Sequence, residues 1–249
     1  MTRMVAFDLD GTLAESKAPI SIAMAAALAA LLEVADVAII SGGDWPQFEK
    51  QVVAQMLRGA RLDGLWLLPT TGTKLYRLQQ DRWTRIYADL FSETERAAIL
   101  AAFDTALANA GLADERIWGD RIEDRGSQIT FSGLGQEAPL EAKAGWDPDR
   151  KKRTLLQTQL QAALPGLAIN LGGTTSIDIT RGGVDKASGL RRLSEESGIP
   201  LSDFVFLGDA IYPGGNDYPA ASLGIDLVPV RDVKETATAI RALTIGLRG

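Results

Sequence analysis

The chain has 249 residues, 46% of them hydrophobic, and a formal net charge of −6. This hydrophobic fraction is too high for a disordered chain, and the acidic balance argues against nucleic acid as a partner. The chain contains neither Cys nor His, which excludes disulfides and the thiolate, imidazole and zinc chemistries that need these side chains. Carboxylates, Lys and Ser/Thr remain, and they suit a hard cation such as Mg²⁺.

The chain also carries no sign of a membrane segment or a secretion signal. It has no run of about 18 apolar residues, and its start, MTRMVAFDLD, lacks the apolar stretch and cleavage site of a signal peptide. We therefore expect a cytoplasmic protein with no membrane partner.

Residues 5–13, VAFDLDGTL, are apolar up to two aspartates and then turn at a Gly-Thr pair. This pattern predicts a buried strand that delivers Asp8 and Asp10 to the edge of a sheet. One carboxylate could attack a phosphorus atom while its neighbour donates a proton to the leaving oxygen. An Asp-rich turn without chemistry is the alternative interpretation.

A second strand is expected at residues 36–40, after an Ala- and Leu-rich helix at 20–35. Strand, helix and strand predict a βαβ unit and hence an α/β fold with a Rossmann-like parallel sheet. The second strand ends at Ser41 and Gly42, whose hydroxyl and backbone amides could bind phosphate oxygens. A plain turn is again the alternative.

The pattern of polar and apolar residues changes after a helix expected at 45–57 and a short strand expected at 65–69. Residues 74–76 and 83–87 alternate like an exposed hairpin, expected at the edge of a separate sheet. Further on, a capping box at 92–95 opens a helix, and Asp147 with Pro148 is expected to begin another. We predict an inserted α/β cap domain at 83–182 and a core formed by 1–82 and 183–249.

After the insertion, Lys186 stands at a helix start, which is an unfavourable place for a cation. The apolar run 204–208 then delivers Asp209, followed by a polar loop that contains Asn216 and Asp217. The carboxylates of Asp8 and Asp209, with the Asp10 carbonyl, would supply three oxygen ligands to Mg²⁺. Asn216 and Asp217 are expected behind them, where they would orient Lys186 or a metal-bound water.

These motifs resemble, in order, those of the haloacid dehalogenase superfamily of aspartyl-phosphate phosphotransferases, in the subgroup with a large α/β cap. Within it, GGVDKASGL and GDAIYPGGND are similar to the eukaryotic-type phosphomannomutase family. The resemblance implies Asp8 as nucleophile, Asp10 as acid and base, and Ser41, Gly42 and Lys186 as phosphate ligands. It also implies that Arg125, Ser176 and Asp178 bind the substrate from the cap.

The sequence departs from this family at three positions. In the cap, Gln136 and Leu171 stand where arginines are expected, and in the core Lys17 lies near a position where the family carries an arginine. An amide and an alkyl chain hold a second phosphate less firmly than guanidinium groups do. We therefore expect a Mg²⁺-dependent phosphatase that hydrolyses a small phosphate ester, of sugar-phosphate type.

The alternatives are a phosphomannomutase and a catalytically idle sugar-phosphate sensor. A monomer and a homodimer paired through the cap are both compatible with the sequence.

Overall fold

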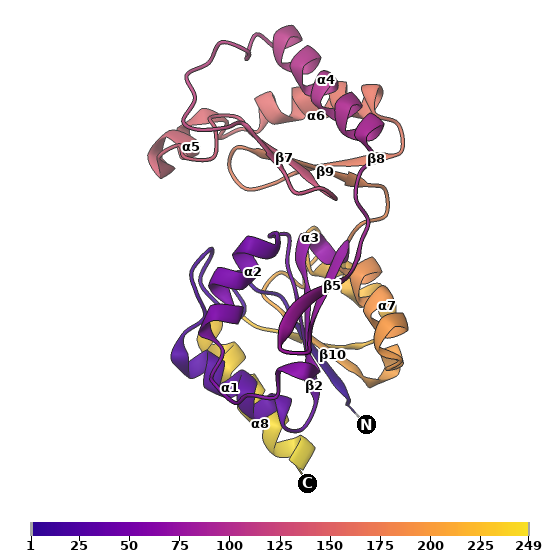
Figure 1. Ribbon diagram of the computed structural model, residues 1–249. Helices are drawn as coiled ribbons and strands as arrows, with labels where there is room; N and C mark the ends of the chain where they lie inside the picture. Colours follow the sequence, from indigo (N-terminus) through magenta and orange to yellow (C-terminus); the bar gives the residue numbers. More distant parts are fainter. Residues whose placement is uncertain (1, 249) are drawn as a thin grey trace. The chain divides into compact units, whose positions relative to one another are not determined.

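The computed structural model describes residues 2–248, which form two compact units (Figure 1). Within the described residues, the first unit contains 2–88 and 185–248, and the second contains 89–184. Each unit has its own hydrophobic core. None of the helices in the described part of the chain has the length and apolar character needed to cross a membrane.

The first unit is built on a seven-stranded sheet with the order β11-β10-β1-β2-β3-β4-β5. The five strands from β11 to β3 are parallel, and β4 and β5 are antiparallel to their neighbours. The strands are β1 (Met4–Phe7), β2 (Asp36–Ile40), β3 (Leu65–Leu68), β4 (Lys74–Gln79), β5 (Arg82–Ala88), β10 (Phe204–Gly208) and β11 (Asp226–Pro229).

Helices cover both faces of this sheet, as its buried β1 and β2 require (Figure 1). Alternate strand residues pack against α1, α2 and α8 on one face and against α7 on the other. The helices are α1 (Ile22–Leu32), α2 (Trp45–Gln51), α3 (Pro69–Gly72), α7 (Lys186–Ser197) and α8 (Val233–Arg248). Short 3-10 turns are η1 (Val53–Gln55), η2 (Leu62–Gly64), η3 (Leu201–Asp203) and η4 (Tyr218–Leu223).

The hairpin β4–β5 belongs to this sheet, so the prediction that it lies at the edge of a separate sheet is wrong. β4 pairs with β3 through Trp66 and Leu67, and β5 completes the edge. Alternation of polar and apolar residues indicates that one face of a strand is exposed, but it does not determine which strand pairs with it. The units accordingly divide after residues 88 and 184, whereas the sequence placed the insertion at 83–182.

The second unit has a four-stranded antiparallel sheet with the order β6-β7-β9-β8. Helices α4 and α6 cover one face, where Phe103 stacks on Phe131 with ring centroids 5.2 Å apart (Figure 1). The elements are α4 (Glu93–Asn109), β6 (Ile122–Asp124), β7 (Ile129–Ser132), α5 (Leu140–Trp146), α6 (Lys151–Ala163), β8 (Leu167–Leu171) and β9 (Ser176–Arg181). We call this unit the cap unit.

The expected helix start at Asp147 is corrected by the structure, in which α6 begins at Lys151 after a left-handed Arg150. The Asp147 carboxylate nevertheless caps α6, because it accepts from the backbone N of Lys152 (2.9 Å) and of Arg153 (3.1 Å). It also accepts from Arg153 Nε at 2.8 Å. The Asp147 carboxylate thus caps α6 from outside the helix and also forms a buried ion pair with Arg153.

Gly72 and Gly189 let α7 approach the loop after β3. A Cβ at Gly189 would lie 2.6 Å from Ile40 Cδ1 and 3.0 Å from the Thr71 carbonyl oxygen. Gly189→Ala should therefore lower the free energy of unfolding by roughly 1–3 kcal/mol, although Ala favours a helix by about 1 kcal/mol. Gly246→Ala in α8 is the control, because its Cβ would meet nothing within 4 Å. Equal midpoints of the two variants in urea would contradict this packing.

Candidate active site

Three strand ends bring the predicted acids and hydroxyl to one edge of the first sheet. β1 lies between β10 and β2, and all three run parallel. Asp8, Asp209 and Ser41 each follow directly after one of these strands. The carboxyl ends of parallel strands are where α/β folds place their ligands. The sheet order therefore brings these residues to one edge.

Lys186 is the buried cation of this edge. It is the first residue of α7, only 1% of its surface is exposed, and its ammonium contacts carboxylate oxygens of Asp8 and Asp217. Burial pulls the pKa of Lys186 down, but attraction to the two carboxylates outweighs it and the pKa is raised. Lys186 is therefore a fixed positive charge at the candidate nucleophile.

Asp8 is held in an environment that disfavours its charge. Burial raises the pKa of this carboxyl group to about 6, with Lys186 acting to lower it and Asp217 to raise it further. The buried ammonium orients the buried carboxylate of Asp8, an arrangement that suits its predicted role as the nucleophile.

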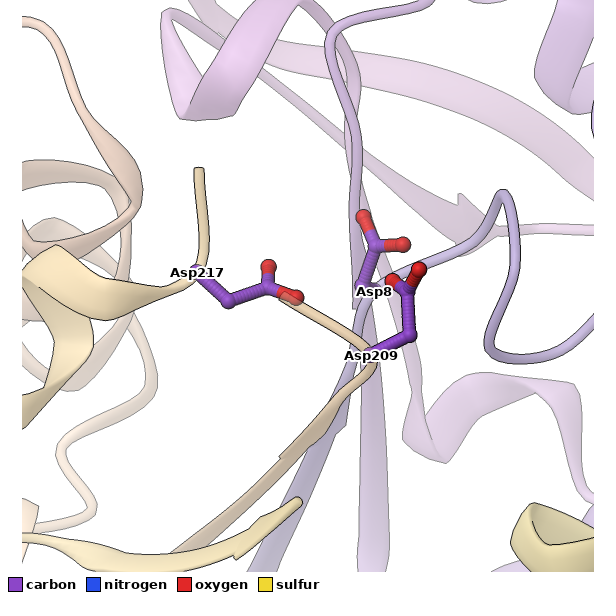
Figure 2. A group of neighbouring side chains, drawn as sticks. All are labelled: Asp8, Asp209 and Asp217. Atoms are coloured by element: carbon purple, nitrogen blue, oxygen red, sulfur yellow. The ribbon is translucent and has the colours of Figure 1, made fainter. Parts of the chain in front are cut away.

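Carboxylate oxygens of Asp8, Asp209 and Asp217 all lie within 4.8 Å of one another. Figure 2 shows Asp8 and Asp209 side by side, with Asp217 pointing toward them. Asp217 has Lys186 on Oδ1 and the Ala210 backbone N on Oδ2, at 2.9 Å. Its oxygens are thus engaged, which suits the predicted role of orienting Lys186.

The remaining oxygens fit a divalent cation. Asp209 is exposed, and a Cβ at Gly11 would lie 2.5 Å from its Oδ2. Gly11 therefore leaves space in front of this carboxylate, and Thr12 Oγ1 fixes its other oxygen at 3.3 Å. An all-oxygen, partly solvated set of this kind suits Mg²⁺.

The predicted phosphate loop is tied to the turn that follows β3. Ser41 Oγ accepts from the Gly43 backbone N at 3.4 Å, and the Ser41 carbonyl accepts from the Thr71 N at 2.8 Å. Thr70 N donates to the Gly43 carbonyl at 2.8 Å. Thr70 and Thr71 have φ values of 49° and 58°, which β-branched residues rarely adopt.

Asp10 has partners of its own, separate from the cluster around Lys186. Its Oδ1 accepts from the Lys17 backbone N at 2.7 Å and from Gln51 Nε2 at 3.3 Å. Its Oδ2 accepts from Gln47 Nε2 at 3.0 Å. The sequence reasoning missed both glutamines, although their i, i+4 spacing behind the phosphate loop places them on one helix face.

The predicted substrate ligands Arg125, Ser176 and Asp178 lie in the cap unit. Arg125 donates from Nε and Nη2 to the two oxygens of Glu123, each at 2.9 Å. Asp178 Oδ1 accepts from Thr130 at 2.7 Å and from a buried glutamine amide at 3.0 Å. Ser176 begins β9 on the strand that carries Asp178. Both charged ligands are therefore already fixed by neighbouring side chains.

Asn216 is the predicted site residue that the structure leaves apart. It is exposed, and within residues 2–248 its side chain makes no hydrogen bond, whereas its neighbour Asp217 is fully buried. Lys186 is thus oriented by Asp8 and Asp217 rather than by Asn216. The Asn216 amide remains a candidate for contact with a metal-bound water.

Solved structures place the fold in a known class. A haloacid dehalogenase-like hydrolase from Bacteroides thetaiotaomicron matches with a TM-score of 0.66 and 16% identity, over 98% of this chain and 100% of that one. The IMP-nucleotidase of Plasmodium falciparum matches with a TM-score of 0.71 and 14% identity, over 98% of this chain and 62% of that one. The protein has the haloacid dehalogenase-like fold, which confirms the predicted fold class.

Sequence comparison gives the family within this class. The family model for eukaryotic phosphomannomutase matches residues 24–224. The phosphomannomutase of Schizosaccharomyces pombe is 26% identical over 222 residues, covering 86% of this chain and 83% of that protein. The enzyme of Encephalitozoon cuniculi is 27% identical over 217 residues, covering 85% and 81%. The chain belongs to the eukaryotic phosphomannomutase family, and it is an enzyme of phosphoryl transfer.

The raised pKa of Asp8 predicts a pH dependence of stability without metal. The gap between the usual pKa of 3.8 and a folded-state pKa of about 6 corresponds to about 3 kcal/mol. Because the folded state binds this proton more tightly, the stability from protonated Asp8 is complete below pH 4 and is lost as the pH rises through 6. Asp8→Asn mimics the protonated form. The free energy of unfolding of this variant relative to that of wild type should therefore increase as the pH rises from 4 to 7.5.

The measurement is urea unfolding of both proteins in EDTA at several pH values. Asp209→Asn is a matched control, since it removes a neighbouring exposed carboxylate. A stability difference between Asp8→Asn and wild type that stays constant or shrinks with rising pH would contradict the assignment.

Proposed function

We propose that the protein transfers the phosphoryl group of a hexose phosphate through a phospho-Asp8 intermediate. The observation that carries this proposal is the buried contact of Lys186 with Asp8 and Asp217. Lys186 holds the nucleophilic carboxylate and offers its charge to the incoming phosphoryl oxygens. The Ser41 hydroxyl and the Gly42 amide bind the remaining oxygens of the same group.

In the first step an oxygen of Asp8 forms a bond to phosphorus as the bond to the sugar oxygen breaks. Asp10 gives the leaving oxygen its proton. In the second step an acceptor hydroxyl attacks phospho-Asp8 while Asp10 takes the proton back, and the Asp8 carboxylate is released. Mg²⁺ on Asp8, Asp209 and the Asp10 carbonyl would neutralise phosphoryl charge.

The nature of the acceptor decides between two enzymes. The matched relatives are named phosphomannomutases, which favours a sugar hydroxyl as the acceptor. The enzyme would then convert mannose 1-phosphate to mannose 6-phosphate by way of a hexose bisphosphate. We place this mutase reaction first, ahead of the hydrolysis that the sequence alone favoured.

Hydrolysis is the second candidate, and the cap unit supplies the observation that favours it. Gln136 has a buried side-chain Nε2 without a hydrogen-bond partner in the described chain, and its backbone carbonyl accepts from Lys143 Nζ at 2.9 Å. Leu171 packs against the cap core. The single ammonium group of Lys143 near position 136 would bind a second phosphate less tightly than paired guanidinium groups do. An intermediate that is held weakly leaves, and water then becomes the acceptor.

The first experiment incubates the protein with mannose 1-phosphate and Mg²⁺, with and without glucose 1,6-bisphosphate. Mannose 6-phosphate and free phosphate are followed together. We expect isomer formation that depends on the bisphosphate, and loss of turnover in EDTA or in Asp8→Asn. Phosphate release without isomer would overturn the mutase in favour of the phosphatase. Absence of turnover on a wide panel of sugar phosphates would favour the remaining alternative, a catalytically idle sugar-phosphate sensor.

Restoring an arginine tests the role of position 136. If water is the acceptor, Gln136→Arg should reduce the ratio of phosphate to isomer several-fold, because the guanidinium group retains the bisphosphate longer. If the protein is already a mutase, the ratio should hardly change. Gln161→Arg is the control, since it adds the same charge on the exposed surface of α6. An equal effect of both variants would contradict any local role of Gln136.

A further inference from the structure

The carboxylate of Asp10 is surrounded by three N–H donors that carry no charge. Oδ1 accepts two of them, from the Lys17 backbone N at 2.7 Å and from Gln51 Nε2 at 3.3 Å. Oδ2 accepts one, from Gln47 Nε2 at 3.0 Å. In the described part of the chain no ammonium or guanidinium group forms an ion pair with Asp10. The carboxylate is therefore oriented by hydrogen bonds and is not neutralised.

Both side-chain donors come from α2, which follows the Ser41–Gly43 loop directly. The Asp44 side chain caps this helix through the Trp45 backbone N at 2.7 Å. Gln47 and Gln51 stand one helical turn apart, so they share one face. Gln51 is only 1% exposed, and its amide also donates to the Ala18 carbonyl at 2.6 Å. The loop that binds phosphate and the amides that hold Asp10 thus belong to one continuous segment.

Gly43 provides the space that this arrangement needs. A Cβ at Gly43 would lie 2.1 Å from Gln47 Oε1, closer than nonbonded atoms can approach. Gly43 does not have a positive φ, so its backbone conformation does not require glycine. Its lack of a side chain is explained by the Gln47 amide, which packs against its Cα and faces Asp10.

We infer that Gln47 and Gln51 are positioning residues that fix the direction of the Asp10 carboxylate relative to the phosphate loop. This inference rests on the proposed function, in which Asp10 gives a proton to the leaving oxygen. Oδ1 is occupied by two donors, so Oδ2, with the single donor Gln47, is the oxygen that faces the leaving group. An amide suits this task because it orients the carboxylate and cannot exchange a proton with it.

The test compares two substrates that differ in their need for a proton. Phenyl phosphate releases phenolate, whose basic oxygen must be protonated as it leaves. 2,4-Dinitrophenyl phosphate releases dinitrophenolate, which is stable as an anion. The variant Gln47→Met keeps the length of the side chain and removes its donor. Because kcat/KM reports the first step, we expect it to fall about tenfold to a hundredfold for phenyl phosphate. For the dinitrophenyl ester we expect less than about a threefold fall.

Two further variants separate positioning from general damage to the fold. Gly43→Ala leaves every donor in place and pushes Gln47 aside, so it should reproduce the preference for the dinitrophenyl ester. Gln55→Met is the matched control, because that amide donates to the Lys50 carbonyl at 3.1 Å, away from Asp10. Its ratio of the two kcat/KM values should equal that of wild type. Asp10→Asn marks the largest change of this ratio that loss of the acid can produce.

The outcomes distinguish this inference from the function on which it rests. Phosphate trapped on Asp8 of wild type, with Gln47→Met equally impaired on both esters or faster on either, would overturn the positioning role alone. Absence of phospho-Asp8 and of turnover by wild type would overturn the proposed function and the inference together. Selective loss on phenyl phosphate in both Gln47→Met and Gly43→Ala would support the inference.

Discussion

The contact between the Lys186 ammonium and the carboxylates of Asp8 and Asp217 is the interaction on which the rest of the site depends. All three groups are at least 96% buried, so each charge is stabilised by its charged neighbours and not by water. Burial alone would drive Lys186 toward its neutral form, yet the two acids keep its charge. The parallel order β10-β1-β2 and the start of α7 deliver these groups to the same edge.

The cap unit divides its sheet into an apolar and a polar face. Ile129 and Ile177 point into the core beneath α4 and α6. Their strand neighbours form a polar row that runs across the sheet by register: Glu123, Thr130, Asp178 and Asn170. Such a row offers donors and acceptors suited to sugar hydroxyls. The row itself contains no cation, and Arg125, which follows β6, is paired with Glu123 of the row.

Local patterns predicted those parts of the fold and the site that depend only on strand ends and helix starts. Asp8, Ser41 and Asp209 follow apolar runs, and parallel strands bring such positions together wherever they lie in the chain. The sheet partner of the β4–β5 hairpin and the Asp147–Arg153 pair depend on tertiary contacts, which local propensity does not encode. The same is true of Thr70 and Thr71, where backbone bonds to Ser41 and Gly43 impose a left-handed turn.

That turn shows how the site is held in place before a substrate arrives. Left-handed threonines cost roughly 1–3 kcal/mol each, and the structure sustains them with hydrogen bonds to both ends of the Ser41–Gly43 loop. On its other side the same loop continues into α2, whose glutamines hold Asp10. The phosphate loop and the acid are thereby fixed on one frame beside Asp8. Phosphoryl transfer depends mainly on such fixed geometry and charge, and less on covalent chemistry by the protein. The strain at Thr70 and Thr71 is therefore the energetic cost of holding the proposed phosphate loop in place without a ligand.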